Sequence, residues 1–266
     1  MEEEFHNHMR IPWHDYTRKS LGHPITEASL SEKASIIGRT GIMLLSCGTG
    51  AWRVRSSMNT LARELGITCT ADIGLLSIEY TCIAGGDCYT ESLCLFNTGV
   101  NTSKLYRMEL FVNKFATNCK KMSGDELHTL LDQIHEIHGF YSPPFLGLAA
   151  AVACCAFTFL LGGGPIEMFC AFLGAGAGNY LRAKMNQHHL TLFLCTAASV
   201  ALACVVYTIS FMALKSGFDV SIHHQAGYIC SMLFIIPGFP FITSGIDLAK
   251  LDMRSGLERL TYAIII

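Results

Sequence analysis

Four long apolar stretches in the second half of the chain restrict its fold more than any other feature. They cover residues 145–161, 165–181, 190–214 and 226–248, and the loops between them are short. Each approaches or exceeds the ~20 apolar residues that a helix needs to cross a bilayer. One such stretch could be a core helix of a soluble protein, but four in succession would leave that protein with almost no polar face. The pattern therefore predicts an all-α polytopic membrane domain.

Charged side chains are distributed as unevenly as the apolar ones. Residues 1–142 carry 29 Asp, Glu, Lys and Arg side chains, whereas the remaining residues carry 11. We therefore expect a polar N-terminal tail (1–30), a cytoplasmic α+β domain (31–142) and a transmembrane helical domain (143–266) with four complete spans and the start of a fifth. The net charge is −2 and no basic run occurs, so binding to nucleic acid is not expected.

The short loops of the membrane domain predict its orientation. Loops that face the cytoplasm carry an excess of Lys and Arg. The loop between the second and third stretches and the segment after the fourth hold five such residues, namely Arg182, Lys184, Lys250, Arg254 and Arg259. The loops on the other side hold one, Lys215. This places the N-terminal domain in the cytoplasm, in agreement with the absence of an apolar signal-peptide core in residues 1–20.

The last apolar segment is too short to cross a bilayer. Residues 257–266 would form about 15 Å of helix against roughly 30 Å of hydrocarbon. Two interpretations stay open: the segment begins a fifth span, or it is a short C-terminal helix that packs against the bundle.

The N-terminal domain shows both helical and strand patterns. Apolar periodicity predicts helices at 31–45, 51–65, 105–119 and from 124 to about 139, and strands within 67–96 with a turn at Gly85–Asp87. Ser123 and Glu126 match a capping box before the last of these helices. Cys82, Cys88 and Cys94 recur every six residues, which on an extended chain would put the three thiols on one face.

The fourth apolar stretch contains Pro237, Gly238, Phe239 and Pro240. Two prolines remove two backbone donors, so the helix is expected to break there. Broken helices inside membranes often place their free ends at a substrate or ion. We therefore predict that the break binds substrate, with a second half-helix that starts near Ile242, Thr243 and Ser244. The alternative is a purely structural kink.

Two carboxylates and one amide complete the expected site. Asp247 lies one turn beyond Ser244 and is a candidate for both substrate binding and proton coupling. Glu167, in the first turn of the second span, is a further candidate for proton coupling, although a charge at a helix N-terminus is an equally simple role. Asn179 follows a stripe of small residues, Gly174–Gly178, which is typical of close helix packing. Asn179 is assigned either to substrate or to hydrogen bonds between helices.

Signals for enzymatic chemistry are weak. No nucleophile elbow, Walker A or kinase signature occurs, so no catalytic residue, cofactor or enzymatic activity is expected. His128, His135, His138 and Asp132 could gather on one side of a helix, but their spacing matches no established zinc motif, and no metal site is predicted.

Several short motifs together resemble one transporter family. They are Gly38-Arg39 to Leu44-Leu45, Gly48–Gly50 with Arg53-Val54, Asn97–Asn101, Gly162–Gly164, Pro237–Pro240, and Asp247 with Ser255–Leu257 and Arg259. In this order, over residues 31–266, they resemble the larger YjjP-like portion of the threonine/serine exporter (ThrE-type) family.

The resemblance implies a role in transport across the bacterial cytoplasmic membrane. It implies proton-driven export of L-threonine and L-serine, with succinate as the alternative substrate, and a separate small YjjB-like membrane subunit as partner in a larger oligomer. A membrane-anchored regulatory or scaffold protein without transport activity is the alternative from another functional class.

Overall fold

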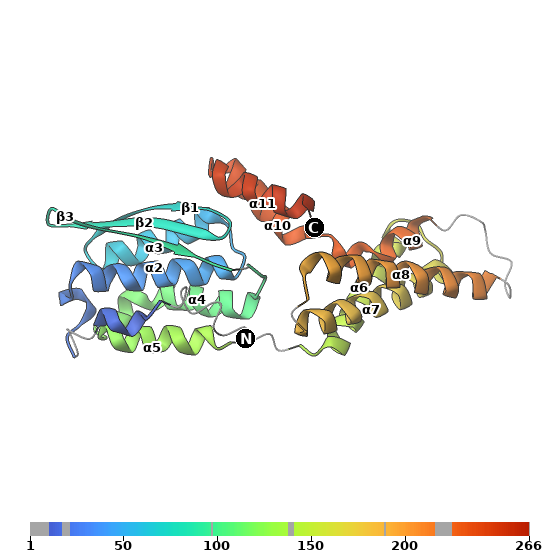
Figure 1. The fold of residues 1–266 in the computed structure, drawn as a ribbon, viewed down its shortest axis with the longest axis horizontal. Helices are drawn as coiled ribbons and strands as arrows, with labels where there is room; N and C mark the ends of the chain where they lie inside the picture. The colour runs from blue at the N-terminus through green and yellow to red at the C-terminus, as the bar shows by residue number, and fades with distance from the viewer. Residues whose placement is uncertain are drawn as a thin grey trace. The chain divides into compact units, whose positions relative to one another are not determined.

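The computed structural model describes residues 11–17, 22–96, 98–137, 141–188, 190–215 and 225–265. By their contacts the residues fall into two compact units (Figure 1). The first unit joins residues 1–139 with 239–264, and the second unit holds residues 140–238 with the last two residues. This division differs from the expected one, because residues 239–264 group with the N-terminal domain.

The first unit is an α+β structure that starts with two short 3-10 turns, η2 (Trp13–Thr17) and η3 (Ile25–Glu27). It continues through α2 (Leu30–Ser46), α3 (Ala51–Glu64), β1 (Thr68–Ile73), β2 (Ser77–Ala84), β3 (Asp87–Cys94), α4 (Thr102–Lys114), the π-turn η4 (Phe115–Cys119) and α5 (Gly124–His135). The three strands form one antiparallel sheet in the order β1-β2-β3. Helices α2 and α3 lie between this sheet and the pair α4 and α5 (Figure 1).

Helix α2 is the centre of the first unit, and thirteen of its seventeen residues are buried. Two glycines allow its neighbours to approach. A Cβ atom at Gly38 would overlap the Tyr80 hydroxyl of β2, and one at Gly41 would lie 2.7 Å from the Met58 sulfur of α3. The Tyr80 hydroxyl lies 3.0 Å from the Ala34 carbonyl oxygen, so the sheet is joined to α2 by a polar contact as well as by apolar packing.

Most local predictions for this region are confirmed. Helices and strands occur in the expected order, and Gly85 and Gly86 take positive φ angles of 59° and 92° in the β2–β3 turn. Ser123 and Glu126 form the predicted capping box. Helix α5 ends at His135, earlier than expected, and residues 138–140 lie outside the described residues.

The described part of the N-terminal segment contributes to the core, because Ile25 is fully buried there. One expectation for the first unit is wrong. Cys82, Cys88 and Cys94 do not share a face, since the Gly85–Gly86 turn separates β2 from β3. Cys82 is buried, while Cys88 and Cys94 are exposed.

The second unit is a helical bundle of α6 (Pro143–Leu160), α7 (Pro165–Gln187), α8 (Leu192–Lys215), α9 (Gln225–Ser231) and the 3-10 turn η5 (Leu233–Ile235). Helix α7 contacts both α6 and α8. A Cβ atom at Gly174 would lie 2.8 Å from the Ala203 carbonyl oxygen, and one at Gly178 would lie 2.8 Å from the Ser199 carbonyl oxygen. The stripe of small residues therefore allows close helix packing, as predicted.

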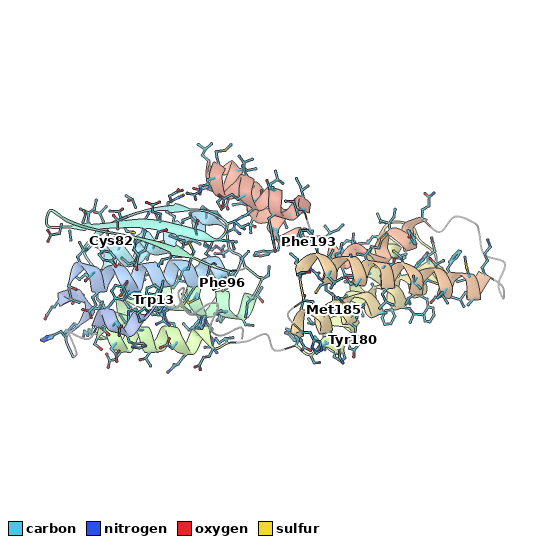
Figure 2. The ribbon with its side chains drawn as sticks, viewed as in Figure 1. Trp13, Cys82, Phe96, Tyr180, Met185 and Phe193 are labelled. Carbon is cyan, nitrogen blue, oxygen red and sulfur yellow. The ribbon has the colours of Figure 1, made fainter. Side chains whose placement is uncertain are left out.

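Large apolar side chains face outward from this bundle. Phe159 and Leu160 of α6 are 65% and 73% exposed, and Ile209 and Met212 of α8 are 63% and 66% exposed. Phe193, labelled in Figure 2, is also on the surface. Such an arrangement suits hydrocarbon surroundings, because lipid does not penalise exposed apolar groups.

Among the described residues, α6 and α8 are the two single helices long and apolar enough to cross a membrane. Residues 225–235 and α10 (Gly238–Ala249) meet the same criterion only together, bent by 70° at the break between them. Helix α7, which carries Glu167, Arg182 and Lys184, is not among the helices that meet it. The expected layout of four complete spans is therefore supported in part.

The fifth apolar segment is longer than expected. Helix α11 (Met253–Ile265) starts before Leu257 and all but its last residue groups with the first unit. Its polar contacts within the first unit reach the α2–α3 turn, β1 and the β1–β2 loop.

Candidate functional site

The fourth apolar stretch is broken where the prolines predict. Helix α9 ends at Ser231, the η5 turn follows, and α10 starts at Gly238 after extended backbone at Ile236. The Gly238 N–H donates to the Ile236 carbonyl at 2.8 Å. Pro240 lies in the first turn of α10, where proline is tolerated because the first N–H groups of a helix have no partner within it. The half-helix therefore begins four residues before the predicted start at Ile242.

The hydroxyl groups after the break are used within the protein. Thr243 Oγ1 lies 3.0 Å from the Phe239 carbonyl oxygen of the preceding turn. Ser244 is fully buried, and its hydroxyl donates to the Gly256 carbonyl of α11 at 2.7 Å. Ser244 thus joins α10 to α11, and this contact was not part of the prediction.

Helices α10 and α11 form a tight hairpin. The Asp252 N–H donates to the Asp247 carbonyl at 2.9 Å, and Leu251 in the turn has a φ angle of 63°. A Cβ atom at Gly256 would lie 2.7 Å from the Leu248 side chain. Glycine at this position therefore lets the two helices approach each other.

Asp247 is fully buried at the centre of a polar cluster, and one carboxylate oxygen makes its polar contacts within the described residues. Asp247 Oδ2 accepts from the Ala51 N–H at 3.1 Å and from the Ser255 hydroxyl at 3.0 Å. Arg259 Nε lies 3.3 Å from the same oxygen. We call Asp247, Ser255 and Arg259, with the α2–α3 turn that they contact, the Asp247 cluster.

Arg259 ties this cluster to the α2–α3 turn. Its guanidinium is buried and donates to the Gly48 carbonyl at 3.0 Å and to the Thr49 carbonyl at 2.7 Å. Its Nε also lies 3.1 Å from the Ser255 oxygen. Arg259, which the sequence places among the basic residues of the loops, is thus a buried residue of this cluster.

The N-terminus of α3 obtains its cap from a distant segment. Its N-cap residue, Gly50, has no side chain to accept from the first N–H groups, and Asp247 accepts from Ala51 instead. A Cβ atom at Gly50 would lie 2.7 Å from Asp247 Oδ1, so glycine leaves the space that the carboxylate occupies. A carboxylate at a helix N-terminus is also favoured by the helix dipole.

The second oxygen of Asp247 is different from the first. Asp247 Oδ1 is buried and has no hydrogen-bond partner among the described residues. A buried polar atom without a partner is costly. Within the cluster, Oδ1 is therefore the atom that is free to accept a further hydrogen bond.

Further charged side chains, ranging from the nearly buried Asp252 to the exposed Arg254 and Asp72, join the same elements. Arg55 of α3 pairs with Asp252, and Arg254 of α11 pairs with Asp72 of β1. Glu258 accepts from the Leu75 N–H at 2.6 Å. These residues therefore connect the α10–α11 hairpin to α3, β1 and the β1–β2 loop.

A cavity of about 410 Å³ with several basic side chains lies next to these charged residues. It is lined by Trp52, Arg55, Ser56, Asn59, Thr60, Arg63, Lys250 and Asp252. Lys250 Nζ lies 5.8 Å from the centroid of the Trp52 ring, within the usual range of a cation–π contact. Anions that approach the hairpin would therefore meet a positive surface there.

The other two candidates lie in the second unit. Glu167 Oε2 accepts from the Gly164 N–H at 2.8 Å and so caps α7, which is the simpler role considered for it. Asn179 Nδ2 donates to the Leu146 carbonyl of α6 at 2.8 Å. Both groups therefore support helix packing within that unit.

The histidine group on α5 is a structural cluster. His128 is buried, its Nε2 lies 3.1 Å from the Ser35 hydroxyl, and its carbonyl accepts from Arg39 at 2.9 Å. Burial and the nearby Arg39 charge lower the pKa of His128 to about 3. No group of three or more metal-ligating side chains is found in the described residues, and His138 lies outside them.

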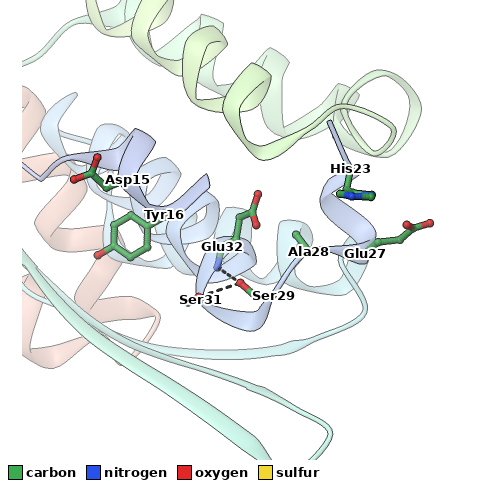
Figure 3. Close-up of a pocket in the computed structure, with 8 residues that line it drawn as sticks. All are labelled: Asp15, Tyr16, His23, Glu27, Ala28, Ser29, Ser31 and Glu32. Atoms are coloured by element: carbon green, nitrogen blue, oxygen red, sulfur yellow. Dashed lines mark hydrogen bonds between the residues drawn. The ribbon is translucent and has the colours of Figure 1, made fainter. Parts of the chain in front are cut away.

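A further cavity of about 490 Å³ lies near the start of α2 (Figure 3). Asp15, Glu27 and Glu32 contribute carboxylates to it, and the Ser29 and Ser31 hydroxyls hydrogen-bond at 3.1 Å. None of its lining residues belongs to the Asp247 cluster.

Sequence reasoning found Asp247 but not the groups that hold it. The Ala51 N–H and the Gly48 and Thr49 carbonyls are main-chain atoms, which no pattern of side chains reveals. Gly48–Gly50, Asp247, Ser255 and Arg259 were all among the motifs that suggested a family, and the structure brings these separate motifs together. Pro237, Gly238 and Pro240 form the break that leads to this hairpin.

Comparison with known proteins gives three results. Residues 35–266 match the family model described as "Putative threonine/serine exporter". A protein of Escherichia coli (strain K12) named "Probable succinate transporter subunit YjjP" is 25% identical over 229 residues, which cover 85% of this chain and 86% of that protein. A protein of the same name from Klebsiella aerogenes is 24% identical over 229 residues, 85% of this chain and 84% of that protein. No solved structure matches.

Proposed function

The chain belongs to the threonine/serine exporter family, and we propose from this premise that it is the larger membrane subunit of a secondary exporter for small carboxylate-bearing metabolites. The observation that carries the proposal is the broken helix followed by a buried Asp–Arg pair. Its α6 and α8 helices are long and apolar enough to cross a membrane. The proposed activity is transport, without enzymatic turnover.

Proton coupling in this proposal occurs at Asp247 Oδ1. While Asp247 is ionised, Oδ2 holds Arg259 and the Ala51 N–H, and the hairpin is tied to the α2–α3 turn. A proton on Oδ1 would neutralise the carboxylate and weaken the ion pair with Arg259. The guanidinium could then pair with a substrate carboxylate, for which its geometry is well suited.

The break is the proposed place of substrate binding. Pro237, Gly238 and Pro240 interrupt the backbone hydrogen bonds, and Thr243 and Ser244 offer hydroxyl groups on the next turns of α10. Opening of the hairpin would free the Ser244 hydroxyl from the Gly256 carbonyl. Asn179 and Glu167 are kept as secondary candidates, for substrate and proton respectively, although their present contacts stabilise helices.

Two substrate classes are proposed. Membership of the family favours L-threonine and L-serine, and the names of the two relatives favour succinate. All three compounds carry a carboxylate that Arg259 could bind. Succinate carries a second carboxylate, and the basic cavity that contains Arg63 and Lys250 would attract it more strongly than a zwitterionic amino acid.

The assembly follows from the same comparison. Both relatives are named as transporter subunits, so we propose a separate small YjjB-like membrane subunit as partner, in a complex that is oligomeric. The proposed location is the bacterial cytoplasmic membrane, with the N-terminal domain in the cytoplasm. In this proposal α7 and the bent pair complete four spans, surrounded by lipid.

Efflux measurements test the proposal. Cells that produce this chain, with and without the partner subunit, are loaded with labelled threonine, serine or succinate. We expect efflux of at least one compound only when both subunits are present, and its loss when an uncoupler collapses the proton gradient. Efflux that persists without a gradient would contradict proton coupling.

Variants connect the activity to the site. Asp247→Asn, which cannot ionise, is expected to reduce efflux at least tenfold, and the combined change of Pro237→Ala and Pro240→Ala is expected to do the same by straightening the helix. Matched controls are Asp72→Asn, an exposed carboxylate, and Pro165→Ala at the start of α7. Full efflux in the proline variant would favour a scaffold role for the chain and a transport path elsewhere.

A further inference from the structure

Two cysteines lie directly opposite each other in the sheet of the first unit. Cys69 of β1 pairs with Cys82 of β2 in the antiparallel register. The other two cysteines of the sheet have no such partner, since Cys88 lies opposite Ile83 and Cys94 opposite Ser77. Cys69 and Cys82 therefore form the one cross-strand cysteine pair among the described strands.

Both thiols are on the inner face of the sheet. Cys69 is 7% exposed and Cys82 is fully buried, in the core that the sheet shares with α2 and α3. Cys82 is labelled in Figure 2, on the helix side of the sheet. The interaction with Cys82 lowers the pKa of Cys69, whose sulfur also lies 3.9 Å from the Thr70 carbonyl oxygen. Both cysteines are free thiols in this structure.

The backbone geometry suits a covalent bond between them. Directly opposite residues of antiparallel strands have Cα atoms about 4.5 or 5.5 Å apart, depending on the hydrogen-bonding pattern. Disulfides bridge Cα atoms that are about 4.4–6.8 Å apart. Either type of pair lies in this range, so a bond between Cys69 and Cys82 needs no change of register.

We propose that Cys69 and Cys82 form a reversible thiol–disulfide site that responds to peroxide. The Cys69 thiolate attacks one oxygen of hydrogen peroxide, which gives a sulfenic acid at Cys69 and releases one water after proton transfer. The Cys82 sulfur then attacks the Cys69 sulfur and expels the hydroxyl group as a second water. Two electrons pass from the two thiols to the peroxide, and a dithiol reductant reverses the bond by exchange.

The position of the pair gives the disulfide a structural effect. The bond would close the segment from residue 69 to residue 82, which contains the β1–β2 loop. Within this segment Leu75 donates to Glu258 and Asp72 pairs with Arg254, and both partners are on α11. Oxidation would therefore stiffen the part of the sheet that holds α11. The chemistry of the pair does not depend on the proposed transport function.

Peptide mapping of the full-length chain in detergent micelles tests the site. The protein is treated with hydrogen peroxide, its remaining thiols are alkylated after denaturation, and it is digested without reductant. We expect a peptide that links Cys69 to Cys82, two alkylated thiols fewer than the twelve of the reduced chain, and recovery of both thiols with dithiothreitol. Alkylation of both Cys69 and Cys82 after peroxide treatment would overturn the proposal, as would a bond from either one to another cysteine.

Serine variants provide the controls. Cys88→Ser and Cys94→Ser are expected to retain the linked peptide, whereas Cys69→Ser and Cys82→Ser should lose it. If a buried serine prevents folding, the map of the unmodified chain still decides the question, because it identifies both partners directly. Oxidation of Cys69 only to sulfinic acid, with Cys82 alkylated, would also count against the site.

Discussion

The two units differ in how much of their large apolar surface they bury. The core of the first unit consists of large apolar groups such as Ile36, Leu44 and Tyr80. In the second unit Gly174 and other small residues allow close helix contacts, a small cluster around Tyr207 and Phe211 is buried, and many large apolar groups face outward. The first pattern is that of a domain in water, and the second suits a bundle in lipid.

The α10–α11 hairpin combines features of both. By contacts it groups with the first unit. Apart from Ala263, however, its buried side chains are polar, namely Thr243, Ser244, Asp247, Ser255 and Arg259. Its large apolar groups Ile242, Leu257 and Ile264 are 65%, 50% and 68% exposed. The hairpin shows that helices can be attached to a domain with an apolar core through buried charged groups while their own exposed face stays apolar. The unit that a helix contacts therefore does not decide whether its exposed face is polar or apolar.

The largest effect is expected from breaking the buried ion pair. Arg259→Met should lower the free energy of unfolding by about 3–5 kcal/mol, because it leaves the Asp247 charge buried without its partner. Asp247→Asn should cost less, since Arg259 keeps the Gly48 and Thr49 carbonyls and the asparagine can still accept from Ala51. Denaturant unfolding of the chain in detergent measures both.

The double variant sharpens this test. Combined, the two changes should cost less than the sum of the single ones, because no unpaired charge remains. Arg254→Met, at an exposed pair on the same helix, should change stability by no more than about 1 kcal/mol. Additive effects of the two buried changes would contradict a direct interaction between them.

The pH dependence of the free energy of unfolding should report on His128, which is buried in the first unit. The pKa of His128 in the folded chain is about 3, against 6.5 when unfolded. Between these values the unfolded state binds the additional proton, so stability should fall as pH decreases, by about 1.4 kcal/mol per pH unit. Unfolding measured from pH 7 to pH 4, with His128→Gln as reference, tests this slope.

The neighbouring His14 changes stability with pH in the opposite direction. Hydrogen bonds to Asp125 and Asp132 raise the pKa of His14, so its contribution is present at low pH and is lost as pH rises through its folded pKa. His14 is about half exposed, and water weakens its effect. A slope that is the same in His128→Gln as in the unmodified chain would show that His128 is not the source.

Replacing single glycines by alanine should distinguish the packing of the two units. The expected changes in the free energy of unfolding are smaller than those for the buried ion pair. Gly174→Ala places a methyl group 2.8 Å from a backbone carbonyl oxygen, which cannot move easily, and should cost about 1–3 kcal/mol. Gly41→Ala meets the end of the flexible Met58 side chain and should cost less. Gly245→Ala has open space and should stabilise α10 by up to about 1 kcal/mol. Thermal unfolding gives the order, and equal costs for the first two would argue against rigid packing around α7.

Local features were readable from the sequence because their causes are local. Pro237 and Pro240 lack donors wherever they occur, so the break in the fourth stretch could be predicted, and the same holds for the Ser123 capping box and the Gly85–Gly86 turn. Apolar periodicity likewise predicted α2 and α3, and the length of the unbroken apolar stretches predicted α6 and α8.

Only the tertiary structure decided what Asp247 does. Its partner Ala51 is 196 positions away, and the partner atoms in the α2–α3 turn are main-chain groups that every residue possesses. The same holds for Cys69 and Cys82, whose pairing depends on strand register. Contacts between distant segments arise from the packing of whole helices and strands, which short patterns of residue types do not encode separately.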